Sequence, residues 1–139
     1  MNGFRFFTEL RVRFNETDAQ GVVHNAVHLT WFEIARIAYL AQFPGGYKGL
    51  VEAGVDATTV EAHVRYRDVC RFDDLLHLHV RASDVRGARF RFDYVVERVS
   101  DPPAIVADGW TSHACVDART LRPTRMPAWL VDGIAAVEV

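Results

Sequence analysis

Apolar and polar residues alternate along four segments of the chain, at about 4–14, 60–67, 76–82 and 89–97. A period of two residues is typical of a β-strand with one buried face. A fifth segment, 104–117, is apolar on both faces, which indicates a central strand or one buried at a subunit contact. The turn-like sequences DVRG (84–87) and SDPPA (100–104) separate the last three segments. The pattern therefore predicts five strands.

One long segment between the first two strands, 26–43, carries apolar residues on nearly every face. Asn25 before it is a good N-cap, and the sequence FPGG at 43–46 is a helix stop. The segment is therefore predicted to be a helix that is buried nearly all round. Its polar residues are His28, Thr30, Glu33, Arg36 and Gln42. With these it is a poor membrane span, so we expect a sheet to wrap around it.

The order of these elements predicts an α+β domain in which an antiparallel sheet curves around one central helix. A chain of 139 residues has the length of one domain, so we expect a single unit over 1–139. A sheet with exposed edges and one open face often pairs with a second copy, which favours an oligomer.

Charge and cysteine content narrow the classes of function. A net charge of −2 and a pI of about 6.3 argue against a nucleic-acid-binding protein. The eight arginines between 65 and 98 still allow a local anion site. The two cysteines, Cys70 and Cys115, are typical of buried thiols in a reducing compartment. The charged N-terminus and the lack of a long apolar run predict a cytoplasmic protein without a membrane partner.

Histidines do not indicate a metal site. His63, His77 and His79 alternate on strand faces, and no cysteine or carboxylate stands at ligand spacing in the sequence. We therefore expect no metal ion.

Two spaced motifs resemble the 4-hydroxybenzoyl-CoA thioesterase-like family of hotdog-fold acyl-CoA thioesterases. The first is Asp18 followed by Gly21-Val22-Val23, after a strand that ends in Phe14. The second is WFEIAR at 31–36. Downstream, VRYRDVCRFDD (64–74) and VDARTLRPTRMP (116–127) are similar to the family's second and last strands. The resemblance implies a hotdog fold and acyl-CoA thioester hydrolysis.

The chain departs from the family after Gly-Val-Val. Where many members have an aromatic residue and then His-Ala-Asn-Tyr, this chain has His24-Asn25-Ala26-Val27-His28. These positions shape the acyl pocket and the helix start. The acyl group is therefore open: aromatic, short-chain and medium-chain acyl-CoAs and acyl-carrier-protein thioesters all fit the motif.

Thioester hydrolysis needs an activated attacking group and a donor that polarises the carbonyl. Asp18 is the candidate nucleophile or general base, and the sequence does not choose between the two. The resemblance implies that the backbone N–H of Asn25, at the positive end of the helix dipole, is the oxyanion donor. Gly21 permits tight backbone geometry in the loop, and His24 is a candidate auxiliary acid–base.

Substrate contacts follow from the same resemblance. The candidate phosphate ligands are Arg65, Arg67, Arg71, Arg89 and Arg91, since CoA carries phosphates and arginine presents a forked donor. The resemblance also implies a dimer or tetramer with its site at a dimer interface. Thr59, Glu61 and His63 of a partner chain are weaker candidates to complete that site. No cofactor is expected beyond the CoA of the substrate.

Each of these residues also has a plainer interpretation. Asp18 can be a turn residue, Asn25 a simple N-cap, His28 a packing residue, and Glu33 either a water-ordering group or the ion-pair partner of Arg36. At the level of the whole protein, a hotdog hydratase or dehydratase is one alternative, although its D-x-N-P-x-H motif is absent. A non-catalytic acyl-CoA-binding protein is the other, and an ionised Asp18 beside an apolar pocket disfavours it.

Overall fold

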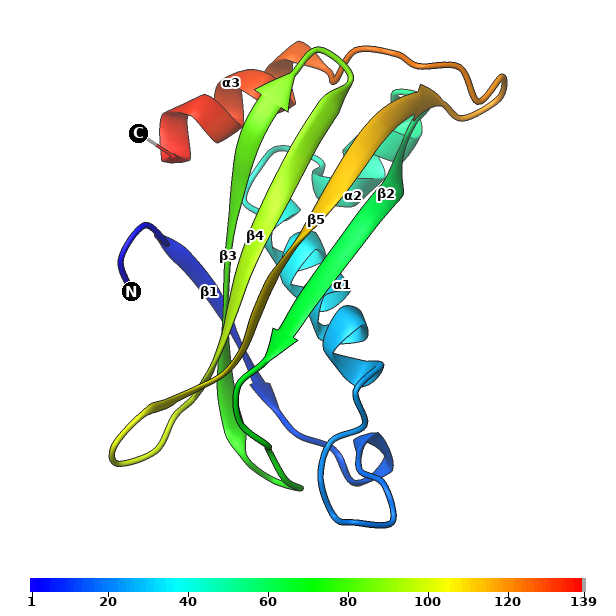
Figure 1. Cartoon of the computed structure of the whole chain (residues 1–139). Coiled ribbons are helices and arrows are strands. Elements are labelled where there is room, and N and C mark those ends of the chain that lie inside the picture. Colours follow the sequence, from blue (N-terminus) through cyan, green and yellow to red (C-terminus); the bar gives the residue numbers. More distant parts are fainter. Residues whose placement is uncertain (139) are drawn as a thin grey trace.

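The computed structural model of the protein describes residues 1–138 and contains a single curved antiparallel sheet (Figure 1). The strands are β1 (Phe6–Arg11), β2 (Val55–Tyr66), β3 (Leu75–Arg86), β4 (Arg89–Arg98) and β5 (Ala104–Asp117). Their order across the sheet is β1-β3-β4-β5-β2. The helices are η1 (Phe14–Glu16, one 3-10 turn), α1 (Val27–Leu40), α2 (Gly46–Glu52) and α3 (Ala128–Val137).

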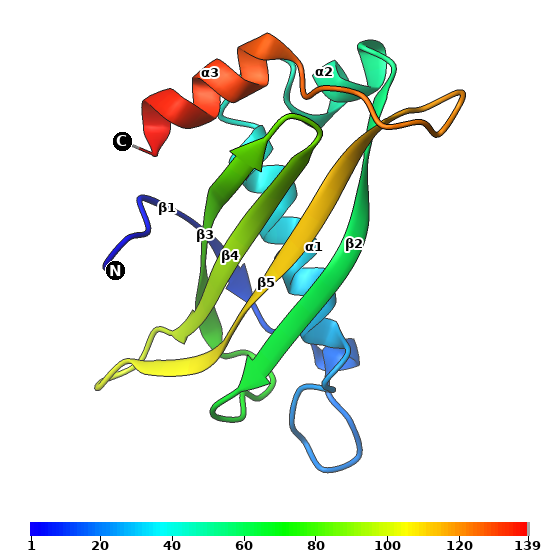
Figure 2. The same ribbon diagram turned by 45° about the horizontal axis from the view of Figure 1, so that its top comes forward.

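Helix α1 lies along the concave face of the sheet, and the two views in Figures 1 and 2 show the strands curving around it. Trp31, Phe32 and Tyr39 are almost completely buried. The Phe32 ring stacks on Tyr94 of β4, with centroids 4.1 Å apart and planes 3° from parallel. Buried and less buried side chains alternate along β4 and along much of β3. This follows from the packing, because every second side chain enters the aromatic core. The predicted α+β architecture, an antiparallel sheet around one long helix, is confirmed.

Several local predictions need correction. The first strand is shorter than 4–14, because a 3-10 turn takes over at Phe14. The helix runs over Val27–Leu40 rather than 26–43. Its N-cap is Ala26, and no side chain caps the helix, so the prediction that Asn25 is the N-cap is wrong.

The helix is also less enclosed than predicted. Leu29 and Ile37 are each 43 % exposed, and Glu33 between them is exposed as well. These three residues recur every fourth position and form one stripe along α1. The sheet covers the opposite face, so the stripe remains uncovered in the single chain.

The fifth strand is central, as its two apolar faces predicted, because it pairs with β4 on one side and β2 on the other. The edges of the sheet are β1 and β2. Over the described residues, no helix has the length and apolar character needed to cross a membrane.

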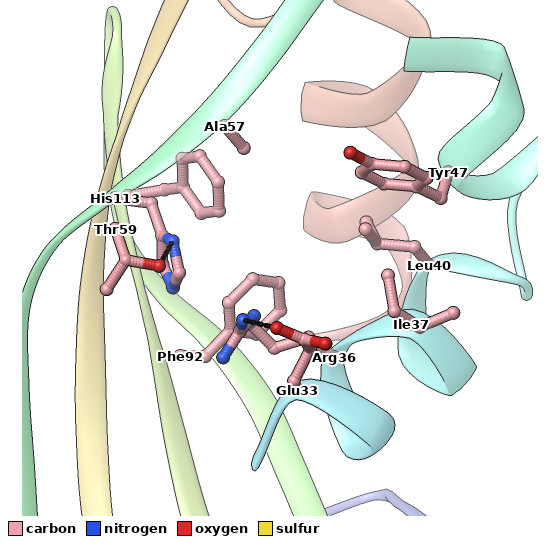
Figure 3. Close-up of a pocket in the computed structure, with 10 residues that line it drawn as sticks. Glu33, Arg36, Ile37, Leu40, Tyr47, Ala57, Thr59, Phe92 and His113 are labelled. Atoms are coloured by element: carbon pink, nitrogen blue, oxygen red, sulfur yellow. Dashed lines mark hydrogen bonds and ion pairs between the residues drawn. The ribbon is translucent and has the colours of Figure 1, made fainter. Parts of the chain in front are cut away.

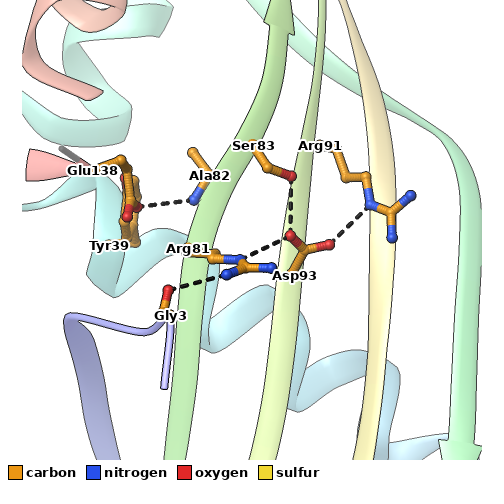
Figure 4. Close-up of polar contacts among 8 residues, drawn as sticks. All are labelled: Gly3, Tyr39, Arg81, Ala82, Ser83, Arg91, Asp93 and Glu138. Atoms are coloured by element: carbon orange, nitrogen blue, oxygen red, sulfur yellow. Dashed lines mark hydrogen bonds and ion pairs between the residues drawn. The ribbon is translucent and has the colours of Figure 1, made fainter. Parts of the chain in front are cut away.

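Two helices were not predicted. α2 and α3 lie together at the end of the sheet opposite the start of α1 (Figure 2). After α3, the Glu138 carboxylate accepts hydrogen bonds from the Tyr39 hydroxyl at 2.5 Å and the Ala82 backbone N–H at 3.1 Å (Figure 4). Burial, together with the adjacent carboxylate, raises the pKa of Tyr39 far above its usual value. This polar contact ties the C-terminal segment to α1 and β3.

The convex face of the sheet is polar. Its most connected residue is Asp93 of β4, which accepts hydrogen bonds from Arg81, Ser83 and Arg91 (Figure 4). These contacts neutralise charge on the solvent-facing side of the strands, while the apolar side packs on α1.

Candidate active site

The loop before α1 is built around Asp18. Its Oδ1 accepts hydrogen bonds from the backbone N–H groups of Gln20 at 2.8 Å and Val22 at 3.4 Å. Its own N–H donates to the Val22 carbonyl, and the Gly21 N–H donates to the Asp18 carbonyl, both at 2.9 Å. Gly21 has a φ of 78°, which favours glycine. Asp18 is therefore a turn residue, yet it is exposed and its Oδ2 has no partner among residues 1–138.

The same loop is fastened to the body of the protein. Thr17 and Val23 form an isolated β-bridge, which brings the two ends of the Asp18 turn together. The Val23 N–H donates to the Cys70 carbonyl at 2.9 Å, and the His24 N–H donates to the Glu16 carbonyl at 3.0 Å. The turn thus stands at the open end of the sheet, next to the start of α1 (Figure 1).

The backbone around Asn25 leaves one donor free. The Ala26 N–H donates to His24 Nδ1 at 3.1 Å, and the Val27 N–H donates to the His24 carbonyl at 3.0 Å. The Tyr66 hydroxyl of β2 donates to the Asn25 carbonyl at 2.9 Å and fixes that peptide. Within residues 1–138 the Asn25 N–H has no acceptor. It therefore lies free at the positive end of α1.

Glu16, which sequence reasoning missed, joins the loop to the helix. Its buried carboxylate accepts hydrogen bonds from Trp31 Nε1 and from the Arg13 backbone and guanidinium, each at 2.8 Å. Burial acts to raise the pKa of Glu16, but these donors outweigh it and lower the pKa. Trp31 belongs to the WFEIAR motif, so part of that motif positions the Asp18 loop. Nothing in the sequence indicates this contact, because Glu16 and Trp31 do not stand at the spacing of any local motif.

His28 is buried against Trp31 and Tyr66, with ring centroids 4.8 and 5.0 Å away. Burial lowers its pKa to about 4, so the ring is neutral near pH 7. Its Nδ1 has no hydrogen-bond partner among the described residues. The interpretation of His28 as a packing residue fits these contacts.

The five candidate arginines do not gather at one place. The Arg71 guanidinium lies by the Asp18 turn, where a Cβ on Gly21 would be 3.8 Å from Nη1. Arg65 and Arg67 lie near the end of β2 on the same side of the molecule, and Arg67 is paired with Asp108. Arg89 and Arg91 lie at the start of β4, at the opposite end of the sheet. Of the five, Arg71 is the one that the fold brings to the loop.

A cavity of about 320 Å³ lies farther along α1, between that helix and strands β2, β4 and β5 (Figure 3). Apolar side chains line most of it: Ile37, Leu40, Tyr47, Ala57, Phe90 and Phe92. The polar lining consists of Glu33, Arg36, Thr59 and His113. Burial and the nearby positive charge of Arg36 lower the pKa of His113 to about 4. Sequence reasoning missed His113, because it stands among apolar residues in a strand with two buried faces.

The histidines on the convex face do have carboxylate neighbours. His79 Nε2 lies 2.9 Å from Glu97 Oε1, and His77 Nε2 lies 3.2 Å from Glu9 Oε1. Ligand atoms of His77, His79 and Glu97 lie within 4.8 Å of one another, so this cluster has the spacing of a metal site. The expectation that no carboxylate accompanies these histidines is wrong, because strand pairing places Glu97 opposite His77. The absence of a metal ion stays a prediction.

One long helix packed on the concave face of an antiparallel sheet, with an acid-bearing turn beside the helix start, is the architecture of a hotdog-fold protein. Residues 12–134 match the thioesterase-like superfamily, and the chain belongs to this family. The fold, the motif resemblance and the enzyme class predicted from the sequence are thereby confirmed at the level of the family.

Individual proteins agree with this assignment. The chain is 32 % identical over 127 residues to an acyl-CoA thioesterase, YbgC, of Haemophilus influenzae, covering 91 % of this chain and 90 % of that protein. A hypothetical protein of Aquifex aeolicus superposes with a TM-score of 0.85 at 26 % identity, covering 93 % and 98 % of the two chains. A thioesterase of Thermus thermophilus, solved with coenzyme A and Zn, superposes with a TM-score of 0.83 at 25 % identity, covering 99 % and 97 %.

Replacing Glu16 with Gln should loosen the loop from the helix. We expect Glu16→Gln to lower the free energy of unfolding at pH 7 by about 1–3 kcal/mol, because a buried carboxylate with three donors is lost. In the parent, the ionised Glu16 contributes its full stabilisation of the fold above the ordinary glutamate pKa of 4.5. This stabilisation is lost as the pH falls through the lower pKa that Glu16 has in the folded state. Chemical denaturation at pH 7 and at pH 3 measures both effects.

The exposed Glu52 of α2 offers the matched control, since Glu52→Gln removes a carboxylate that has no ion-pair partner among the described residues. Equal stability losses for Glu16→Gln at the two pH values would contradict a role for the ionised Glu16.

Proposed function

We propose that this protein hydrolyses acyl-CoA thioesters to a free acid and CoA, with Asp18 as nucleophile or general base. The observation that carries the proposal is the free Asn25 N–H at the start of α1, next to a turn whose aspartate keeps one oxygen unpartnered among residues 1–138. Family membership and the names of the relatives support the same reaction. The reaction needs no cofactor beyond the CoA of the substrate.

The thioester carbonyl would lie between the two groups, with its oxygen on the Asn25 N–H. Negative charge develops on that oxygen as the carbonyl is attacked, and the amide with the helix dipole stabilises it. If Asp18 attacks, a mixed anhydride forms, the CoA thiolate leaves, and water then releases the acid. If Asp18 is a base, it takes a proton from the attacking water, and the same thiolate leaves. Gly21 and His24 shape the loop and the helix start in either case.

The edge strand β2 supports a homodimer with the site at its interface. Val60 is 53 % exposed on this edge strand, whose other side pairs with β5, and the stripe of Leu29, Glu33 and Ile37 runs along the neighbouring helix face. Antiparallel pairing of two β2 strands would pair the backbone groups of the edge and bury apolar surface. Thr59, Glu61 and His63 of a partner would then lie at the interface. A tetramer and a cytoplasmic location are further parts of this proposal.

In such a dimer, the five candidate arginines would approach a bound CoA from different subunits. Arg71, Arg65 and Arg67 lie on the same side of the chain as the Asp18 turn, and we propose Arg71 as the first phosphate ligand. Antiparallel pairing reverses the partner's sheet, so the ends that carry Arg89 and Arg91 would face the turn from the other subunit. The Arg67–Asp108 and Arg91–Asp93 ion pairs would have to open or rearrange for direct phosphate binding.

Asp18→Asn should abolish turnover while keeping the loop. The asparagine side-chain oxygen can still accept from Gln20 and Val22, but it is neither a nucleophile nor a base. We expect kcat/KM for thiol release over a panel of acyl-CoAs to fall by at least about a hundredfold. Asp132→Asn, on the exposed side of α3, is the control and should match the parent. Parent-like activity in Asp18→Asn would remove Asp18 from the chemistry, and tight acyl-CoA binding without thiol release in the parent would favour the binding protein.

Two substitutions at Asn25 distinguish the role of its backbone N–H from the role of its side chain. Asn25→Pro removes an N–H that makes no hydrogen bond among residues 1–138, and we expect kcat to fall by about 10²–10³-fold. Asn25→Ala keeps the N–H and should retain nearly full activity. The thiol-release assay on both variants, with circular dichroism to verify folding, measures the difference. Equal losses in the two variants would show that the side chain, and not the amide, is the group that matters.

A charge on the edge strand should separate the subunits. Val60→Lys places an ammonium group on β2, where edge-to-edge pairing would bury it, so we expect a dimer to become a monomer. Light scattering after size-exclusion chromatography reports the mass. Val99→Lys, an equally drastic change in the exposed turn after β4, should leave the mass unchanged. A parent protein that is already monomeric at micromolar concentration would refute the interface.

A further inference from the structure

The cavity along α1 has a single polar chain at its wall, formed by residues of four elements. Arg36 Nη1 of α1 lies 3.3 Å from the Tyr94 hydroxyl of β4, which lies 2.7 Å from Thr111 Oγ1 of β5. The same Thr111 oxygen lies 2.7 Å from His113 Nε2, and His113 Nδ1 lies 3.4 Å from Thr59 Oγ1 of β2. Tyr94, Thr111 and His113 are each at most 3 % exposed. The middle of the chain is therefore closed to water, and its His113–Thr59 end opens to the cavity.

The direction of the hydrogen bonds follows from Arg36. A guanidinium can only donate, so the Tyr94 oxygen accepts from Arg36, and the Tyr94 O–H must point to Thr111. Were Thr111 to donate to Tyr94 instead, the buried Tyr94 hydrogen would have no acceptor among residues 1–138, which is costly. Thr111 thus donates to His113 Nε2. With Nε2 as acceptor, the neutral ring carries its proton on Nδ1.

This arrangement aims an N–H donor at the cavity. The lowered pKa of His113 keeps the ring neutral near pH 7, so the Nδ1 proton is its only one. Its present acceptor, Thr59 Oγ1, is distant at 3.4 Å and belongs to an exposed residue (Figure 3). A ligand oxygen at a normal hydrogen-bond distance would make a better partner. The rest of the lining is aromatic and aliphatic, which suits an apolar chain.

The position of the cavity sets the length of that chain. Asn25 lies just before α1, and Arg36 lies about 14 Å along the helix from its first residue, Val27, at 1.5 Å per residue. An acyl group whose thioester lies at Asn25 reaches the His113 donor only if it is long and extended. The exposed Glu33 carboxylate, 3.7 Å from Arg36 Nη2, opposes a second negative charge at this point. A neutral oxygen therefore fits better than a carboxylate.

We infer that this cavity holds the distal part of a long acyl group and that the His113 Nδ1–H selects chains with a neutral oxygen acceptor, a hydroxyl or oxo group, far from the thioester. This inference rests on the proposed function for the placement of the thioester. It makes His113 a specificity-determining residue, with Thr111 and Tyr94 as positioning residues that fix its tautomer.

The test compares lauroyl-CoA with ω-hydroxylauroyl-CoA. In the parent we expect kcat/KM for the hydroxylated substrate to be about tenfold higher, the effect of one well-placed hydrogen bond. His113→Phe keeps a ring that can stack on Phe90, whose centroid is 5.1 Å away, but removes the donor. The ratio of the two kcat/KM values should fall to about one in this variant, whatever its absolute rate with lauroyl-CoA.

Two threonine variants form a matched pair. Thr111→Val removes the hydroxyl that donates to His113 Nε2, so the ring is no longer fixed in one tautomer. The ratio of kcat/KM for the hydroxylated substrate to that for lauroyl-CoA should therefore fall. Thr59→Val removes only the competing acceptor and should keep the ratio or raise it. ¹⁵N chemical shifts of His113 should show a protonated Nδ1 in the parent and a changed tautomer mixture in Thr111→Val, a signature that a merely structural threonine would not give.

Binding of the free acids separates this inference from the proposed function. If no acyl-CoA is hydrolysed, calorimetry with lauric and ω-hydroxylauric acids still tests the pocket, and tighter binding of the hydroxy acid that is lost in His113→Phe would support it. Equal affinities and equal kcat/KM values for the two members of each pair, in parent and variant alike, would overturn it. So would an Nε2-protonated His113 in the parent.

Discussion

The structure depends on the burial of one apolar helix against a sheet that can cover only one of its sides. The concave face of the sheet takes Trp31, Phe32 and Tyr39, and the ring stack of Phe32 on Tyr94 fixes how the helix lies on the strands. Two features follow from this packing. The start of α1 lies at the open end of the sheet, and the opposite stripe of the helix stays uncovered beside the unpaired edge of β2.

The segment before α1 is held by hydrogen bonds from several directions, while the Asn25 N–H, the proposed oxyanion donor, has no acceptor among residues 1–138. Glu16 connects the preceding loop to Trp31, Tyr66 holds the Asn25 carbonyl from β2, and His24 takes the Ala26 N–H. Each of these bonds satisfies a polar group that would otherwise be costly to bury or leave loose. Tyr66 and His24 hold the peptide that follows Asn25, and the Val27 N–H holds the His24 carbonyl of the peptide that precedes it. The Asn25 N–H itself has no acceptor among residues 1–138, which suits the oxyanion role proposed for it.

The sequence predicts the strands and the long helix well, because their periods of apolar residues follow directly from burial on one face. It also places Asp18 in a loop next to the helix start. It misses the helices α2 and α3, and it misassigns the N-cap of α1, because the helix begins one residue later than predicted and Ala26 stands at the cap. The sequence fails mainly to predict contacts between strands. Two examples are the pairing of Glu97 with His79 and the hydrogen-bond chain from Arg36 to His113, which join residues that no local pattern connects.

The central claim is that Asp18 and the Asn25 N–H act on the same thioester carbonyl. The most direct measurement is a crystal structure of the parent protein with an acyl-CoA analogue in which a methylene group replaces the thioester sulfur, so that the carbonyl is kept but cannot be cleaved. The account predicts the carbonyl oxygen within about 3 Å of the Asn25 nitrogen, with the Asp18 carboxylate on the other side of the carbonyl carbon, in line for attack or for contact with a water. A carbonyl bound elsewhere, or an Asp18 carboxylate pointing away from it in every subunit, would contradict the account.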